Sequence, residues 1–163
     1  MKISLSKAGL TDASDILEMQ IKAFMPLLHK YQDYETSPAN ETIERIISRM
    51  NQSFSEYYII KNISNPVGAI RIIRKSNKTY RISPIFILPE HQGQRIAQQV
   101  FAMIEEMYND AIVWELDTIL QEHGNCYLYE KLGYKRTEHI EVINEKMTIV
   151  FYEKHMTYLD VNM

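Results

Sequence analysis

Two short stretches of the sequence carry the residues best suited to chemistry, PEHQGQRIAQQVF at 89–101 and NCYLYEKLGY at 125–134. The first lies between a strand-like run and a helix-like run. Backbone N–H groups of such a loop, together with the start of the helix, can bind a phosphate group. Gly93 allows the backbone to approach a ligand closely, and Ala97 keeps the helix start slim. Alone, this is a weak signal, because many polar loops precede helices.

The second stretch predicts a short amphipathic helix. Leu128 and Leu132 share one face, and Gly133 follows in the position where a left-handed residue commonly ends a helix. In isolation, the simplest interpretation is a packed helix with a glycine stop. Cys126 is interpreted as a small buried residue, because no histidine is fixed beside it to activate a thiol.

The elements around these stretches define the expected fold. Alternating and helical hydrophobic patterns predict the order strand, two helices, three strands, helix, strand, helix and two strands. The strand–helix–strand unit around 84–118 should be parallel, and the strand 111–119 reads as central and covered on both faces. We therefore predict an α/β fold for 1–163: one domain with a central mixed, mostly antiparallel sheet of about seven strands and about four helices on its faces.

Composition excludes several classes of protein. The net charge of −3 gives no basic surface for nucleic acid, and no apolar run is long enough to span a membrane. The single cysteine and five scattered histidines predict no disulfide and no metal site. The start of the sequence lacks the apolar core of a signal peptide, so a cytoplasmic location is expected.

Taken together, the two stretches resemble the GNAT acetyltransferases. That family combines a Gln/Arg-x-x-Gly-x-Gly/Ala loop with a later Asn…Tyr-Glu-Lys-x-Gly-Phe/Tyr helix, in the order and separation seen here. The opening segment LSKAGLTDASDILEMQIKAF at 5–24 is also similar to the family's first strand and helix. The resemblance implies an N-acetyltransferase that moves the acetyl group of acetyl-CoA, as co-substrate, directly to a primary amine in a ternary complex.

The resemblance also implies roles for individual residues. Tyr129 matches the family's candidate general acid, because a phenol keeps its proton at neutral pH and can protonate a leaving thiolate. The Ile87 amide, or one near it, would face the thioester oxygen. The residues expected to bind the cofactor through the fourth strand, the loop and the last helix are Ile85, Phe86, Ile87, Gln92, Gly93, Gln94, Arg95, Ile96, Ala97 and Asn125.

The sequence departs from the family pattern in two places. Arg95 stands at the central glycine of the loop, and we expect it at ordinary helical angles, where its guanidinium adds a phosphate contact. A left-handed backbone there would cost arginine about 1 kcal/mol relative to glycine. The stretch YRISPIF at 80–86 lacks the carboxylate that often serves as general base. Glu115 or a chain of waters is left for that role.

The acceptor is expected to bind near 26–38 and the 138–146 hairpin, and to be a small-molecule or peptide amine. Tyr31, Asp33, Tyr34 and Glu35 suit a cation, although a solvated loop explains them equally well. A CoA-binding regulatory module without transfer activity is the alternative hypothesis. A Rossmann-type nucleotide fold is disfavoured because the loop lacks G-x-G-x-x-G spacing. A homodimer is compatible with the sequence.

Overall fold

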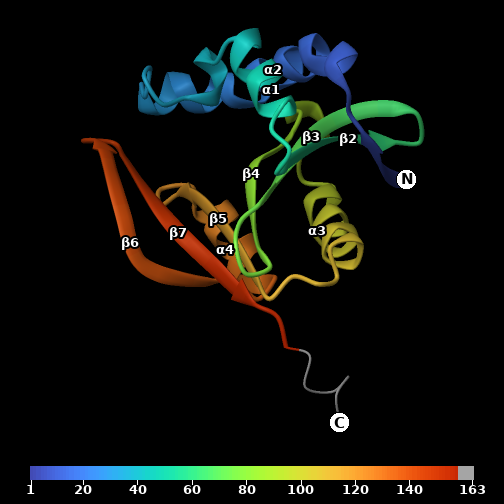
Figure 1. The fold of residues 1–163 in the computed structure, drawn as a ribbon. Helices are drawn as coiled ribbons and strands as arrows, with labels where there is room; N and C mark the ends of the chain where they lie inside the picture. The colour runs from blue at the N-terminus through green and yellow to red at the C-terminus, as the bar shows by residue number, and fades with distance from the viewer. Residues whose placement is uncertain (158–163) are drawn as a thin grey trace.

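The computed structural model describes residues 1–157 and contains one seven-stranded sheet in the order β1-β2-β3-β4-β5-β7-β6 (Figure 1). Every neighbouring pair is antiparallel except β4 and β5, which confirms the predicted mixed sheet. The strands are β1 (Ile3–Lys7), β2 (Ser55–Asn62), β3 (Asn65–Arg74), β4 (Thr79–Ile87), β5 (Val113–Ile119), β6 (Lys135–Asn144) and β7 (Met147–His155). The α-helices are α1 (Ala13–Tyr31), α2 (Ile43–Met50), α3 (Ile96–Met107) and α4 (His123–Lys131).

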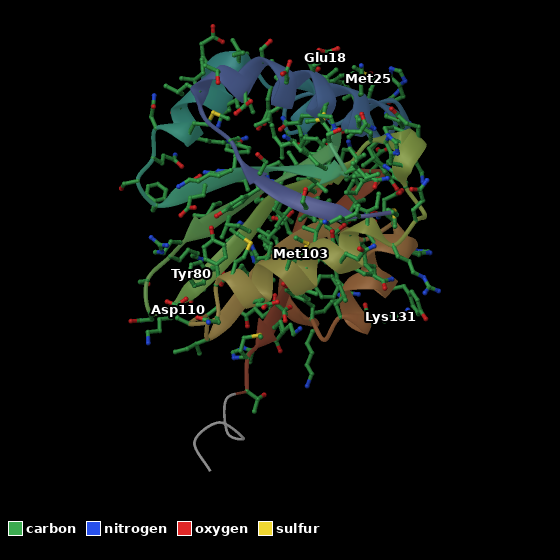
Figure 2. The ribbon with its side chains drawn as sticks, turned by 90° about the vertical axis from the view of Figure 1, so that its right-hand side faces the viewer. Glu18, Met25, Tyr80, Met103, Asp110 and Lys131 are labelled. Atoms are coloured by element: carbon green, nitrogen blue, oxygen red, sulfur yellow. The ribbon has the colours of Figure 1, made fainter. Side chains whose placement is uncertain are left out.

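Helices cover both faces of the sheet. Figure 2 shows Glu18 on α1 and Met103 on α3, on opposite sides of the strands. Successive strand residues point to opposite faces, so β2 contributes to two cores. Tyr57 and Ile59 pack with α1 and α2, whereas Tyr58 and Ile60 pack with α3.

A bulge in β4 interrupts this alternation. Ile85 pairs with Ile70 and Ile82 pairs with Ile72, so two residues of β4 lie opposite the single residue Arg71 of β3. The extra residue shifts the side-chain alternation by one position. Ile85 therefore packs on the α3 core like Ile82, although the two are an odd number of residues apart.

Strands β4 and β5 separate soon after they meet. Their parallel pairing covers only Thr79–Arg81 and Val113–Glu115. Beyond Arg81, the side of β4 that faces β5 has no strand partner in the described chain. The gap leaves backbone N–H and C=O groups of β4 available to a ligand.

Gly68 of β3 allows the close approach that holds this part of β4. A Cβ atom built on Gly68 would lie 2.1 Å from the Phe86 carbonyl oxygen. Only glycine avoids that overlap, so β3 supports β4 directly beside the gap.

The structure corrects the prediction for β5. Trp114 and Leu116 are buried in the α3 core, but Glu115 and Asp117 on the other face are only half-buried. The strand is central, yet within residues 1–157 only one of its faces is fully buried. Asp117 instead pairs with Arg81 of β4, and the Arg81 guanidinium lies over the Phe151 ring.

The end of α4 was predicted correctly: Gly133 is left-handed, with φ of 99°.

No helix within residues 1–157 combines the length and the apolar character needed to cross a membrane.

Candidate active site

A cavity of about 770 Å³ opens at the gap between β4 and β5. It is bounded by the second half of α1, by the end of β4 with its following loop, and by the starts of α3 and α4. Tyr129 and every residue predicted to bind the cofactor except Gln94 line this cavity. The lining members of that set are Ile85, Phe86, Ile87, Gln92, Gly93, Arg95, Ile96, Ala97, Asn125 and Tyr129.

The Ile87 N–H points into the gap. Leu88 donates its N–H to the Val67 carbonyl of β3 at 2.8 Å. Because N–H groups alternate in direction along a strand, Ile85 and Ile87 direct theirs away from β3, toward the separated β5. By the same alternation the Phe86 N–H points toward β3, and its ring packs edge-on against Phe24 of α1 at 5.8 Å. Ile85 and Ile87 therefore supply the open backbone donors at this edge.

The start of α3 has the properties of an anion site. Its first residues line the cavity, no side chain caps its N-terminus, and its first turn contains no acidic residue. The first amides of a helix lack intrahelical partners and carry the positive end of the helix dipole. The Gln92 side chain donates to the Ile87 carbonyl at 2.9 Å and so ties the loop to the strand.

The expected backbone conformation of Arg95 was wrong. Arg95 has φ of 62° and ψ of 23°, a left-handed conformation, and it is the residue that precedes α3. The loop uses two left-handed residues, Gly93 with φ of 78° and Arg95, where Gly93 alone was expected to make the turn. Arginine in this conformation costs about 1 kcal/mol relative to glycine. The Arg95 side chain is exposed at the cavity and has no ion-pair partner within residues 1–157.

Tyr129 lies on α4 with only 8% of its surface exposed. Its ring packs against Phe101 at 5.7 Å and Tyr134 at 6.2 Å between ring centroids. Burial, and after it the charge of nearby Asp117, raises the pKa of Tyr129 above its ordinary value. The hydroxyl has no hydrogen-bond partner in the part of the chain that the structure describes. It is therefore a protonated donor held in a fixed position at the cavity.

The wall formed by α1 was predicted only in part. Residues of its second half line the cavity: those from Pro26 onward lie in the 26–38 segment expected near the acceptor, whereas Ala23 and Phe24 had been assigned only to the packed helix. The lining residues of α1 are Ala23, Phe24, Pro26, Leu27 and Lys30. Helical spacing alone predicted that α1 packs on the sheet, but it carried no signal that the helix crosses the gap.

Glu122 was also missed, although it directly precedes α4. Its Oε2 atom accepts hydrogen bonds from Lys30 Nζ at 2.8 Å and from the Tyr31 hydroxyl. Burial by itself would raise the pKa of Glu122, but these two hydrogen bonds, together with the charge of Lys30, lower the pKa below its ordinary value. The pKa of Lys30 is raised, first by its hydrogen bond to Glu122. The group is thus a charged pair at neutral pH.

Two other predictions, for the general base and for the cation-binding loop, do not fit the cavity. Glu115 bonds to Lys75 at 2.6 Å and is not among the residues that line the cavity. The proposed cation-binding loop is divided: Asp33 is buried, whereas Tyr34 is 61% exposed. The hairpin does approach this region, because Asn144 donates its side-chain N–H to the Tyr31 carbonyl at 2.9 Å.

Comparison with known proteins identifies the family. Residues 28–156 match the acetyltransferase (GNAT) domain model, so the chain belongs to the GNAT acetyltransferases and is an N-acetyltransferase. This confirms the resemblance drawn from the two sequence motifs. No curated protein sequence matches the chain.

Solved structures share the fold at low sequence identity. PaiA N-acetyltransferase from Thermoplasma acidophilum, in complex with coenzyme A, aligns with a TM-score of 0.77 at 14% identity, covering 96% of this chain and 100% of its own. The ribosomal-protein-S18-alanine N-acetyltransferase of Escherichia coli aligns with a TM-score of 0.77 at 10% identity, over 96% and 95%. The spermidine/spermine N-acetyltransferase SpeG of Vibrio cholerae aligns with a TM-score of 0.73 at 14% identity, over 99% of both chains.

Proposed function

We propose that the protein transfers the acetyl group of acetyl-CoA to a primary amine by direct attack in a ternary complex. One observation carries the proposal: a single cavity joins the uncapped start of α3, the open edge of β4 and the protonated Tyr129 hydroxyl. The amides at the start of α3 suit the pyrophosphate of CoA, and the open edge of β4 suits its pantetheine arm. The Tyr129 hydroxyl suits its sulfur.

The cavity lining supports a mode of cofactor binding. The pyrophosphate would bind the amides of residues 92–97 at the start of α3, with Arg95 adding a positive charge. The pantetheine arm would pair with the backbone edge of Ile85 and Ile87. Asn125, at the start of α4, would contact the cofactor from the opposite wall.

Two groups of the cavity would assist the acetyl transfer, the Ile87 N–H and the Tyr129 hydroxyl. The amine nitrogen attacks the thioester carbonyl carbon, and the Ile87 N–H stabilises the negative charge that develops on the oxygen. As the C–S bond breaks, the sulfur leaves with the bonding electrons and takes the Tyr129 hydroxyl proton. The nitrogen releases its proton to water, from which Tyr129 is reprotonated. The products are an N-acetylated amine and CoA with a free thiol.

The test is an amine-panel assay that follows release of the CoA thiol, preceded by thermal unfolding with acetyl-CoA. A ligand that binds only the folded state raises the melting temperature. We expect such a shift, and thiol release well above hydrolysis with at least one amine. No shift at millimolar acetyl-CoA would overturn the cofactor assignment.

A shift without transfer to any amine would favour the alternative, a CoA-binding module without activity. Two features favour this alternative: the left-handed Arg95 and the absence of a carboxylate from the stretch 80–86 of β4. The structural neighbours include a spermidine/spermine N-acetyltransferase and a ribosomal-protein-S18-alanine N-acetyltransferase, so the panel should contain both small amines and peptide amines.

A further inference from the structure

Lys30, Tyr31 and Glu122 form an ammonium site that the chain fills with its own lysine. Glu122 Oε2 accepts from Lys30 Nζ at 2.8 Å and from the Tyr31 hydroxyl. The same Nζ atom lies 5.2 Å from the centroid of the Tyr31 ring. A carboxylate beside an aromatic face is an arrangement that binds an ammonium group both by charge-assisted hydrogen bonding and through the ring.

The site lies on the wall of the cavity. Lys30 comes from the end of α1 and Glu122 from the residue before α4, and both line the cavity although they are 92 positions apart in the sequence. Among the described residues that line the cavity, Glu122 is the only carboxylate. An acceptor that enters along α1 therefore meets a single negative charge, the Glu122 carboxylate.

The lysine can be exchanged at little cost. The Lys30 side chain is 59% exposed, whereas that of Glu122 is 23% exposed. An exposed ion pair contributes little to stability because water solvates both partners well. The carboxylate and the buried Tyr31 form the fixed part of the site, and the lysine is the replaceable part.

An ammonium held here is kept protonated. The Lys30–Glu122 hydrogen bond lowers the pKa of Glu122 and also raises the pKa of Lys30. A protonated nitrogen has no lone pair with which to attack a thioester. The cation that belongs in this site is therefore a second charge of the acceptor, separate from its reacting amine. Phe24 and Leu27 on the adjacent wall provide apolar surface for a hydrocarbon segment between the two.

We propose that Glu122 and Tyr31 bind the distal ammonium of an aliphatic diamine, which replaces Lys30, while its other amine is acetylated. The inference rests on the proposed function and specifies its acceptor. It assigns Glu122 a role in acceptor binding and Lys30 the role of an internal competitor.

The experiment compares 1,4-diaminobutane with 1-aminobutane by calorimetry in the presence of CoA. We expect wild type to bind the diamine about tenfold more tightly, the scale of one charge-assisted hydrogen bond. Glu122→Gln, which keeps the size of the side chain, should reduce that ratio to about one because it removes the charge. Lys30→Met should tighten diamine binding about two- to fivefold, since it removes the competing exposed ion-pair partner.

A matched pair on the same helix serves as control. Lys22 and Glu18 form an exposed ion pair at 3.3 Å, and neither lines the cavity. Figure 2 shows Glu18 on the outer side of α1. Glu18→Gln and Lys22→Met should leave the diamine ratio unchanged, which separates a local effect from a general change in charge.

Two results would overturn the inference: a diamine preference that survives in Glu122→Gln, or weaker diamine binding in Lys30→Met. If Glu122→Gln fails to fold, Tyr31→Phe keeps the ring, loses the hydroxyl and should still reduce the ratio severalfold. Calorimetry reads binding without turnover. Failure of every amine to release CoA thiol would therefore overturn the proposed function separately, whereas an unchanged ratio overturns this inference.

Discussion

The wall of the cavity formed by β4, its loop and α3 presents mainly backbone groups, whereas the α1 wall presents only side chains. On the first wall, the donors come from Ile85, Ile87 and the residues that open α3, a nearly continuous segment. On the second wall, Phe24, Leu27 and Lys30 line the cavity, and Lys30 pairs with Glu122 from a distant part of the chain. The backbone wall suits a ligand that all members of a family share, such as a cofactor. The side-chain wall suits an acceptor that differs from one member to another.

The difference has a physical basis. Backbone donors are set by strand geometry and helix position, so substitutions that keep the conformation leave them in place. Side-chain contacts change with each substitution. Mutations on the β4–α3 wall should therefore act through backbone conformation, and mutations on the α1 wall should act through charge and shape. Tyr129 lines the same cavity, and its proposed role as proton donor would involve both ligands.

Tyr129→Phe gives the largest expected effect, since it removes the proposed proton donor shared by both walls. We expect kcat to fall about a hundredfold, within the usual contribution of a positioned acid. The thermal shift with acetyl-CoA should persist, because cofactor binding depends mainly on backbone groups. The control is Tyr127→Phe on the same helix, where the native ring is 69% exposed and does not line the cavity. Unchanged turnover in Tyr129→Phe would exclude the acid role.

Gly68→Ala tests whether backbone position controls the β4 wall. The new methyl group would overlap the Phe86 carbonyl oxygen and must displace β4. We expect the free energy of unfolding to fall by about 1–3 kcal/mol, as for overpacking elsewhere, measured by urea denaturation. Gly9→Ala is the matched control, because a Cβ at Gly9 meets nothing within 4 Å. Equal stability of the two variants would contradict the close packing of β3 on β4.

Arg95→Gly separates backbone from side chain at a single position. Relief of the left-handed conformation should stabilise the protein by up to about 1 kcal/mol, less the greater freedom that glycine gives the unfolded chain. CoA affinity should nevertheless fall severalfold, because one phosphate contact through a charged group is lost. Arg95→Lys should be intermediate in affinity. Tighter CoA binding in the glycine variant would mean that the arginine is a flaw tolerated by the loop.

The smallest expected effect is in the pH dependence of stability on the α1 wall. The folded pKa of Glu122 is lowered, so its contribution is present above the ordinary carboxyl pKa and is lost as pH falls through the folded pKa. Wild type should therefore exceed Glu122→Gln in melting temperature near neutral pH, and the difference should shrink on acidification below about pH 4. Glu18→Gln, which alters an exposed pair, should show a smaller difference. A constant difference across the range would contradict a charged, hydrogen-bonded Glu122.

A large share of the molecule follows from local sequence. The order of elements, the parallel β4–α3–β5 unit and the left-handed Gly133 were predicted, because hydrophobic period and turn residues act over a few positions. The loop residues and Tyr129 were recognised as a pair through motif spacing. Their arrival around one cavity follows from the parallel strands that precede each of them.

Other features were decided only by the tertiary structure. Arg95 adopts a left-handed backbone because the loop must join a strand end to a helix start at a set angle, and nothing in the neighbouring residues specifies that angle. Glu115 faces Lys75 because of sheet register, and Gly68 matters only because β4 lies against it. Glu122 meets Lys30 and Tyr31 because α1 crosses the gap where β4 and β5 part. Short-range sequence patterns determined the helices, the strands and the motifs of the proposed cofactor site. Contacts between distant segments decided which charged residues lie where the acceptor is proposed to bind.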